Sequence, residues 1–268
     1  MFKLNLDTIN KVQEFNDPYP MIIYSNLLSQ DQLNHLQNSL SVKETIFDKT
    51  YMGNRKTILK GTENFTNFID KNDIANEINN FFDQKVVFNY FYKDLNKLNK
   101  NNNSYFDFKN KKFKYLKNFI SRKKDIFFKI KNKSSKLLSF LFRECRIYCD
   151  FDFSVAGTGY EREAHHDKED RILNFLFYIN DFDQINGGNL QIFKYKNSPE
   201  LYLRQPSIDE FYELNKIEPK KGCLVTFLST PDSLHGVDRI NSTSEKRYFL
   251  YGSYTSIKKI NWKLYKKN

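Results

Sequence analysis

Five short apolar and aromatic segments follow one another between residues 146 and 255. They read RIYCDFDFSVAG (146–157), RILNFLFYIN (171–180), GNLQIFKY (188–195), KGCLVTFLS (221–229) and KRYFLYGSYT (246–255). Glycine, proline, aspartate and asparagine stand between these segments, as is typical of turns between strands. Several short strands separated in this way predict a β-sandwich or barrel in the C-terminal half of the chain.

The N-terminal part of the chain has helical patterns. Residues 18–40, PYPMIIYSNLLSQDQLNHLQNSL, predict a short strand followed by a helix. Ser29 is expected to be the N-cap of that helix, and Gln32, three residues later, completes a capping box. A second helix is predicted over residues 72–86, NDIANEINNFFDQKV. We therefore expect a mainly β protein whose N-terminal helices support a barrel.

The length of 268 residues suits one main domain. No apolar run approaches the ~20 residues that span a bilayer, and the first residues lack the apolar segment of a secretory signal. Cys145, Cys149 and Cys223 are odd in number and have no CxxC spacing, which favours reduced thiols. These features predict a soluble, cytoplasmic protein.

The net charge of +11 is concentrated in one segment. Residues 93–136 contain fifteen lysines or arginines and three acids, a net charge of +12, so the rest of the chain carries −1. Its Lys/Asn-rich first part, 96–115, predicts a loop or insertion. An amphipathic helix is expected from apolar residues at mostly helical spacing, namely Phe113, Leu116, Ile120, Phe127, Ile130, Leu138 and Leu141.

We accordingly divide the single domain into an N-terminal support (1–92), a basic insertion (93–142) and a β core (143–268). Base composition alone does not require that the positive charge be segregated in this way. We hypothesise that residues 93–136 form a lid or arm that recruits an anionic partner, such as an acidic polymer, a phosphorylated precursor or a membrane surface.

Two of the four histidines stand side by side in AHHDKEDR, residues 164–171. Residues i and i+2 of an extended chain share a face, so His165 and Asp167 can point together while His166 points away. His235 follows the predicted strand 221–229, where a barrel can return the chain to the same end. Two imidazoles and one carboxylate leave coordination positions open and suit non-haem Fe(II). We therefore predict a metal site of these three residues, His165, Asp167 and His235.

Each of these residues also has a simpler explanation. Lone His-x-Asp pairs occur by chance, and His166 is expected to cap a turn or to face the substrate entrance. His35, between Leu33 and Leu36 on the first predicted helix, is more typical of a structural residue. Cys145 and Cys149 are expected to pack in the core and not to bind a metal.

A longer series of motifs in the same order resembles a known family. GTGY (157–160) precedes the metal motif, and RILNFLFYIN (171–180), GGNLQIF (187–193), GCLVTFLS (222–229), His235 and Arg247 follow it. Over residues 145–257 this series resembles the 2-oxoglutarate and Fe(II)-dependent oxygenases. The aromatic-Tyr-apolar-Asn end of the strand and the Gly-Gly turn after it are most similar to the prolyl-hydroxylase branch, of the prolyl 4-hydroxylase alpha-subunit type. The resemblance implies a double-stranded β-helix, also called a jelly-roll or cupin-like fold.

The resemblance also implies roles for single residues. His165, Asp167 and His235 match the catalytic triad that holds Fe(II). Arg247 matches the arginine that pairs with the distal carboxylate of 2-oxoglutarate, a role that suits a planar guanidinium. Tyr178 matches the tyrosine that adds a hydroxyl donor to this carboxylate.

Other residues near these positions have weaker assignments. Asn174 and Leu176 share the strand face of Tyr178 and are expected to line the cosubstrate pocket. Arg239 is the rival of Arg247 and is expected at the surface. GTGY stands two residues further from the metal motif than in the family, which leaves Tyr160 as a weak candidate for a cosubstrate contact.

The activity implied by the resemblance is hydroxylation of a small-molecule or peptidyl substrate, because Asp167 occupies the position that halogenating relatives leave free. The implied cofactors are Fe(II), 2-oxoglutarate and O₂, with ascorbate as a further candidate. Two alternatives stay open. One is a metal-binding jelly-roll protein without oxygenase activity, and the other is a protein that binds nucleic acid or another anionic polymer through residues 93–136.

Overall fold

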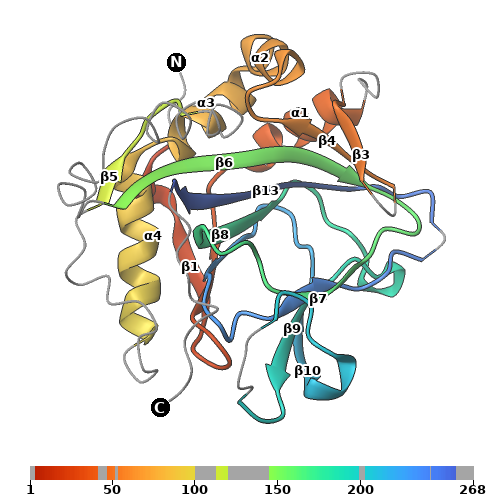
Figure 1. Ribbon diagram of the computed structural model, residues 1–268. Coiled ribbons are helices and arrows are strands. Elements are labelled where there is room, and N and C mark those ends of the chain that lie inside the picture. Colours follow the sequence, from red (N-terminus) through yellow and green to blue (C-terminus); the bar gives the residue numbers. More distant parts are fainter. Residues whose placement is uncertain are drawn as a thin grey trace, which may run out of the picture.

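The computed structural model describes residues 4–41, 47–51, 54–99, 113–119, 145–198, 203–241 and 243–257. Two facing β-sheets form its C-terminal half, with helices on the outer side of the larger sheet (Figure 1). No helix in these residues is both long and apolar enough to cross a membrane.

Eight strands build the barrel. They are β6 (Cys145–Ala156), β7 (Arg162–His165), β8 (Arg171–Tyr178), β9 (Leu190–Tyr195), β10 (Phe211–Ile217), β11 (Leu224–Leu228), β12 (His235–Val237) and β13 (Arg247–Ser256). The larger sheet contains the order β11-β8-β13-β6, and the smaller sheet has the order β10-β9-β12-β7. All these neighbours are antiparallel. Apart from the β9–β10 hairpin, the chain changes sheet at every step, which is the winding of a double-stranded β-helix. The fold expected from the sequence is therefore confirmed.

Further strands extend the larger sheet on both sides. On one side β2 (Met21–Ser25) pairs with β11, and β1 (Asn10–Phe15) pairs with β2. On the other side β4 (Arg55–Leu59) pairs with β6, and β3 (Lys49–Tyr51) pairs with β4. The short strand β5 (Phe113–Tyr115) runs parallel to the start of β6.

Among the described residues the helices are α1 (Gln30–Ser41), α2 (Glu63–Asp70), α3 (Asp73–Phe82) and α4 (Lys85–Leu98), and 3-10 turns lie at Leu6–Thr8, Gln184–Asn186 and Ile208–Glu210. The predicted capping box begins α1. The backbone amide of Gln32 donates to Ser29 Oγ at 3.3 Å, and the side-chain oxygen of Gln32, Oε1, accepts from the backbone amide of Ser29 at 2.8 Å. Thr62 and Asn72 cap α2 and α3 through their side chains.

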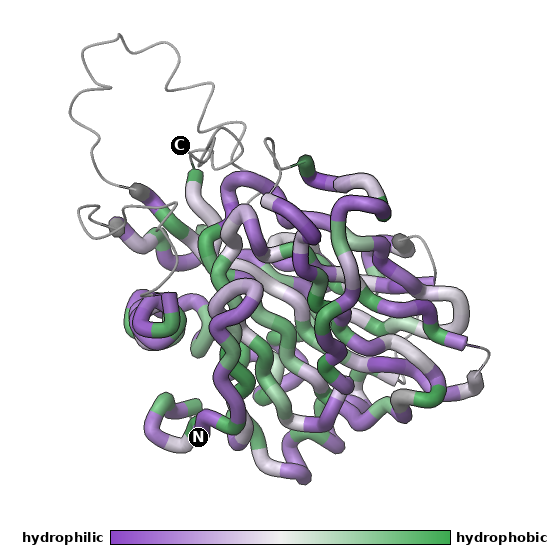
Figure 2. Tube along the Cα trace, turned by 90° about the horizontal axis from the view of Figure 1, so that it is seen from below, coloured by the Kyte–Doolittle hydropathy of each residue, from purple (hydrophilic) through white to green (hydrophobic). Residues whose placement is uncertain are grey.

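The larger sheet separates two apolar cores because successive strand residues point to opposite faces. On β8, Phe175 and Phe177 belong to the core under the helices, whereas Leu176 and Tyr178 belong to the core between the sheets. Phe175 stacks on Phe82 of α3 with ring centroids 4.3 Å apart. Figure 2 shows hydrophobic residues along the central strands and hydrophilic residues in many of the peripheral turns. A strand buried on both faces explains why 171–180 reads as a nearly continuous apolar run.

All five strands expected from apolar segments are present, as β6, β8, β9, β11 and β13. The strands that the sequence did not reveal lack an apolar run. β7 and β12 have only four and three residues, and the middle of β10 is exposed. Their backbone pairing depends on neighbouring strands and not on their own composition.

The expected structure of the basic segment needs correction. The segment 96–115, expected to be a loop, begins with the last turn of α4 and ends in β5. Phe113, expected to begin a helix, lies in β5 instead. Pairing with β6 overrides the helical spacing there. Ile120, Phe127, Ile130, Leu138 and Leu141 lie outside the described residues. The expected helix 72–86 is divided, because α3 ends at Phe82 and α4 begins at Lys85. The division of the chain at residue 92 falls within α4 and stays a prediction.

Candidate metal and cosubstrate site

His165, Asp167 and His235 meet at one end of the barrel. His165 ends β7 and His235 begins β12, and the two residues are direct partners in the antiparallel ladder. Asp167 follows two residues after His165. One ligand atom from each side chain lies within 4.8 Å of those of the other two, and all three residues are buried. Strand register thus brings together residues that are 70 positions apart in the sequence.

Backbone carbonyls fix the orientation of both imidazoles. His165 Nδ1 lies 2.8 Å from the carbonyl oxygen of Glu163, and His235 Nδ1 lies 3.0 Å from that of Ser233. Because a carbonyl only accepts, each Nδ1 carries a proton, and Nε2 is the ring atom that faces the site and can bind a metal. Burial and the neighbouring His235 lower the pKa of His165 to about 3. At neutral pH the His165 imidazole is therefore uncharged, which is the form that binds a metal.

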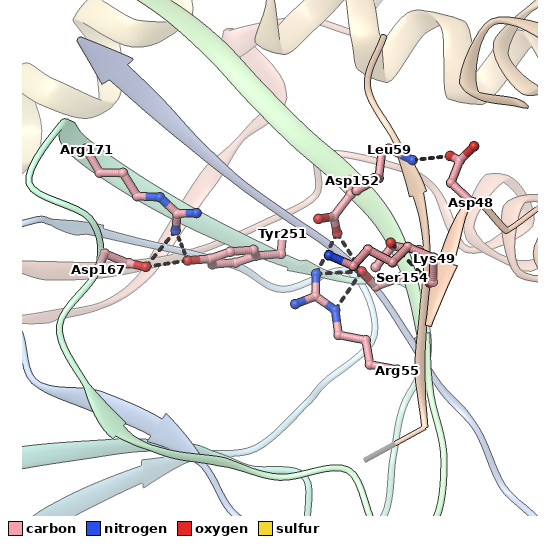
Figure 3. A network of polar contacts seen from close by, with 10 residues as sticks. Asp48, Lys49, Arg55, Leu59, Asp152, Ser154, Asp167, Arg171 and Tyr251 are labelled. Carbon is pink, nitrogen blue, oxygen red and sulfur yellow. Dashed lines mark hydrogen bonds and ion pairs between the residues drawn. The ribbon is translucent and has the colours of Figure 1, made fainter. Parts of the chain in front are cut away.

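The two oxygens of Asp167 have different surroundings. Oδ1 accepts from Arg171 Nη1 at 2.6 Å and from the Tyr251 hydroxyl at 2.8 Å, and Arg171 Nη1 also donates to that hydroxyl (Figure 3). Oδ2 is buried, has no hydrogen-bond partner in the described residues and lies 3.5 Å from His235 Nε2. Burial opposes ionisation, but the Arg171 guanidinium and the hydrogen bond from Tyr251 outweigh it and hold the pKa of Asp167 well below its usual range. Asp167 thus offers one ionised oxygen beside two imidazole nitrogens.

A second set of polar groups without partners lies deeper in the barrel. Arg247, at the start of β13, is 1% exposed, and none of its three guanidinium nitrogens has a hydrogen-bond partner in the described part of the chain. Its guanidinium carbon lies 5.1 Å from the ring centroid of Tyr178 and 4.6 Å from that of Phe249. The buried Tyr178 hydroxyl likewise has no partner there. An unpaired buried guanidinium is costly, so this pair of donors fits an absent carboxylate.

Burial raises the pKa of Tyr178 despite the opposing charge of Arg247. The phenol therefore stays protonated at neutral pH and can donate a hydrogen bond. Gly188 lies beside this region with φ +77°, and a Cβ there would come within 3.5 Å of Arg247 Cδ. The second glycine of the Gly-Gly turn is thus required by its backbone conformation, whereas a contact of 3.5 Å with the arginine would be an ordinary one.

One cavity of about 350 Å³ reaches from the triad to Arg247, whereas Tyr178 lies behind Arg247 and does not line this cavity. The cavity is lined by the triad, by Arg247, and by apolar and aromatic residues that include Leu176, Phe227 and Phe249. Tyr160, the weak candidate, also lines it. Asn174 is fully buried on the expected strand face, with both amide atoms unpartnered in the described structure, but it does not reach the cavity wall.

Three further residues that the sequence made alternative candidates, His166, Arg239 and His35, do not line the cavity. The expectation that His166 caps a turn or faces the substrate entrance is wrong. It is fully buried, and its Nε2 lies 2.8 Å from the Tyr195 hydroxyl, because the next residue after an inward-facing His165 points to the other side. Arg239 is at the surface as expected, with a 65% exposed side chain near Glu161. His35 lies on the exposed side of α1.

The sequence did not reveal eight polar residues of the cavity wall, namely Arg55, Asp152, Glu161, Arg162, Lys168, Arg171, Arg204 and Tyr251. Arg55 Nη2 donates to Asp152 Oδ1 at 2.6 Å and to Ser154 Oγ at 2.9 Å. The Tyr251 ring lies between the two guanidinium groups, 5.0 Å from the carbon of Arg171 and 5.5 Å from that of Arg55 (Figure 3). One sequence signal was usable: Tyr251 stands four residues after Arg247 and hence on the same strand face.

Comparison with known proteins identifies the barrel. Residues 151–254 match the family model of the 2OG-Fe(II) oxygenase superfamily. The chain carries a 2OG-Fe(II) oxygenase domain. This match confirms the expected superfamily and an oxygenase enzyme, and the superfamily implies Fe(II), 2-oxoglutarate and O₂. No curated protein matches the sequence.

Solved structures with a similar chain trace include three prolyl hydroxylases. A Pseudomonas putida prolyl-4-hydroxylase has 13% identity and a TM-score of 0.42 over 89% of this chain and 94% of its own. The viral collagen prolyl hydroxylase of Paramecium Bursaria Chlorella virus-1 has 13% identity and a TM-score of 0.43 over 92% and 95%. A prolyl 4-hydroxylase from Phytophthora capsici has 13% identity and a TM-score of 0.49 over 88% and 58%.

The residues of the oxygenase domain fit both implied groups. Two imidazoles and one carboxylate oxygen are the donor set that suits non-haem Fe(II) and leaves coordination positions open. Arg247 and Tyr178 present buried donors without partners at the far end of the same barrel. A dicarboxylate that reaches from the triad to Arg247 would satisfy both ends.

Proposed function

We propose that the chain is a 2-oxoglutarate- and Fe(II)-dependent hydroxylase in which His165, Asp167 and His235 hold the iron. The observation that carries this proposal is the half-satisfied Asp167 carboxylate: Oδ1 is bound by Arg171 and Tyr251, whereas Oδ2 is buried, unpartnered and close to His235 Nε2. Such an arrangement favours a carboxylate that binds the metal through one oxygen only. The triad would then occupy three coordination positions and leave the others to cosubstrate and O₂.

Arg247 and Tyr178 are proposed to bind the distal carboxylate of 2-oxoglutarate. The guanidinium supplies two parallel donors and a full charge, and the protonated phenol supplies a third donor. Leu176 and Phe249 would contact the carbon chain between the carboxylates. When bound, iron and 2-oxoglutarate supply oxygen activation that is coupled to decarboxylation and hydroxylates a substrate C–H bond.

The protein's own contribution is orientation and exclusion of water. Backbone carbonyls hold the imidazole rings, Arg171 and Tyr251 hold Asp167, and the apolar side chains of Leu190, Phe227 and Val237 line the cavity near the histidines. Groups fixed in this way need little reorganisation during the reaction.

We infer a peptidyl substrate of the prolyl-hydroxylase type. The support is the sequence motif that ends β8, Phe-Tyr-Ile-Asn followed by a Gly-Gly turn, which resembles the prolyl-hydroxylase branch. In the structure Asn180 Oδ1 accepts from the Tyr248 amide at 2.7 Å, and its Nδ2 donates to the Lys246 carbonyl at 3.0 Å. These bonds hold the end of β8 to the start of β13, where Arg247 lies. Gly187 and Gly188, the turn of the same motif, both have positive φ. A small-molecule substrate, a use of ascorbate and a cytoplasmic location stay predictions.

The hypothesis of an anionic partner for residues 93–136 also stays a prediction. The structure describes only 93–99 and 113–119 of that segment. The alternative of a metal-binding barrel without oxygenase activity is disfavoured, because such a protein has no use for buried donors like Arg247 and Tyr178.

The metal assignment is tested first. Asp167→Ala should abolish Fe(II) binding and iron-dependent succinate release, because only two ligands remain. His35→Ala on the exposed side of α1 is the control and should change neither. Retention of full iron affinity by the Asp167 variant would exclude this triad.

The cosubstrate assignment is tested by calorimetric titration with 2-oxoglutarate. Arg247→Leu should weaken binding roughly tenfold to a hundredfold, since a hydrogen bond to a charged group contributes about 1.5–3 kcal/mol. Fe(II) affinity should stay nearly unchanged. Arg239→Leu, the matched control at the surface, should bind 2-oxoglutarate normally, and the reverse result would transfer the role to Arg239.

A further inference from the structure

The cavity wall carries more positive than negative side chains. Six of its residues are cationic, namely Arg55, Arg162, Lys168, Arg171, Arg204 and Arg247, and three are anionic, namely Asp152, Glu161 and Asp167. The cavity residues thus have a formal net charge of +3 when the histidines are neutral. Fe(II) and the 2-oxoglutarate dianion have opposite charges of equal size, so loading the site leaves this excess in place.

The excess does not come from the residues already assigned. Arg55 pairs with Asp152 at 2.6 Å, and Arg171 pairs with Asp167 at 2.6 Å. Arg247 is proposed to bind the distal carboxylate of 2-oxoglutarate. Glu161, the remaining acid, lies 3.5 Å from Arg239, which is outside the cavity wall.

Three cations remain: Arg162, Lys168 and Arg204. Their side chains have no ion pair with any residue that the structure describes, and all three residues are exposed. We call these three residues the cationic rim, because exposed residues that also line the cavity lie at its mouth.

The cationic rim is tied to the metal motif by the backbone. Arg162 begins β7, the strand that ends at His165, and Lys168 directly follows Asp167. Arg204 lies on a separate loop, but its carbonyl accepts the His166 amide at 2.8 Å. Arg162 and Lys168 thus lie within three residues of a metal ligand, and the backbone of Arg204 is bonded to the residue between His165 and Asp167. A group bound at the rim would therefore be held close to the reacting centre.

We propose that the cationic rim binds an oxyanion side chain, carboxylate or phosphate, that neighbours the hydroxylated residue of a peptide substrate. The proposal rests on the proposed function and names its substrate class. A cluster of like charges above apolar walls attracts anions and repels cations. Arginine provides paired donors that suit either oxyanion. The rim thus selects acidic or phosphorylated peptides over neutral and basic ones.

The test compares three labelled peptides of equal length, each with a central proline flanked by glutamate, phosphoserine or glutamine. Their binding to the full chain loaded with Fe(II) and 2-oxoglutarate is measured by fluorescence anisotropy without oxygen, at low and at physiological salt. The affinity of the glutamate and phosphoserine peptides should be about tenfold higher than that of the glutamine peptide. The difference should shrink with salt, because exposed charges are screened beyond ~8–10 Å.

Variants show whether the rim is responsible. Arg162→Gln combined with Arg204→Gln should remove most of the preference, and the two lysine substitutions at the same positions should keep it. Lys71→Gln, which loses one exposed charge beyond the end of α2, is the control. Equal binding of all three peptides overturns the proposal, as does a preference that survives in the double glutamine variant. A preference for phosphoserine alone assigns the oxyanion to phosphate, and a preference for both assigns it to either source.

Failure of this proposal is distinguishable from failure of the proposed function. The double glutamine variant should bind Fe(II) and 2-oxoglutarate as the unaltered protein does, because neither arginine is assigned to them. Normal metal and cosubstrate binding without any peptide preference refutes only the rim. Loss of metal binding in the Asp167 variant without any change in peptide preference supports both assignments separately.

Discussion

At the residue scale, the site is marked by buried polar atoms that lack hydrogen-bond partners in the described residues. Arg247, Tyr178 and Asp167 Oδ2 are buried without partners in the described structure, although burial of an unpaired polar atom is unfavourable. Asp167 Oδ1, in contrast, has two donors. The partners of Oδ1 determine which oxygen stays available to a metal, so Arg171 and Tyr251 act through Asp167.

This role gives a prediction for Tyr251. Tyr251→Phe removes the 2.8 Å hydrogen bond to Asp167 but keeps the ring between the two guanidinium groups. We expect metal affinity to fall roughly tenfold to a hundredfold, as is usual when a partner of a ligand is lost. Calorimetric titration with Mn(II) measures the change. Tyr212→Phe, on the exposed side of β10, is the control and should bind Mn(II) normally, and equal affinities for the two variants would contradict the role.

At the scale of the element, β13 connects the two cores. Its residues Arg247, Phe249 and Tyr251 line the cavity, whereas Leu250 and Tyr254 belong to the core under the helices. Gly252 lies where the strand is most crowded: a Cβ there would meet Phe175 Cζ at 2.3 Å and Phe151 Cβ at 2.5 Å. The Phe175 ring cannot easily move aside, since it stacks on Phe82.

The crowding predicts the effect of an added methyl group. Gly252→Ala should lower the free energy of unfolding by about 1–3 kcal/mol, the usual cost of overpacking a core. Gly157→Ala is the matched control, because a Cβ at Gly157 would meet nothing within 4 Å. Denaturant unfolding of both variants measures the difference. A Gly252 variant as stable as the Gly157 variant would show that the rings rearrange freely.

At the scale of the whole molecule, the proposed metal would join two strands of the smaller sheet to the turn that leads into the larger sheet. Its ligands come from β7, from the turn before β8 and from β12. A metal that binds these three groups together stabilises the native state and not the unfolded chain, in which the ligands are far apart.

Addition of Mn(II) should therefore raise the thermal midpoint of the metal-free protein. At a free concentration one hundred times the dissociation constant, the stabilisation amounts to about 2.7 kcal/mol. The Asp167→Ala variant should show no such rise. An equal rise in both proteins would place the bound ion elsewhere.

Local chemistry and short periodicities in the sequence determined a large part of this structure. The Ser29–Gln32 capping box needs only residues three apart, and the apolar run of β8 follows from burial on both faces. The motif His165-x-Asp167 places two candidate ligands on one side because strand residues alternate. The order of motifs was sufficient to indicate the oxygenase superfamily and its double-stranded β-helix.

Only the tertiary structure decided which distant residues complete the site. Tyr251 and Asp167 are 84 positions apart, and their hydrogen bond depends on the register of strands in the larger sheet. The same holds for Arg55 beside Asp152, for the burial of His166 against Tyr195, and for Arg204 beside the metal motif. Phe113 lies in a strand because β6 offers a free edge there, although its own sequence favoured a helix. Pairing and burial act between segments that no local pattern connects, so the partners of each charged group became known only from the folded chain.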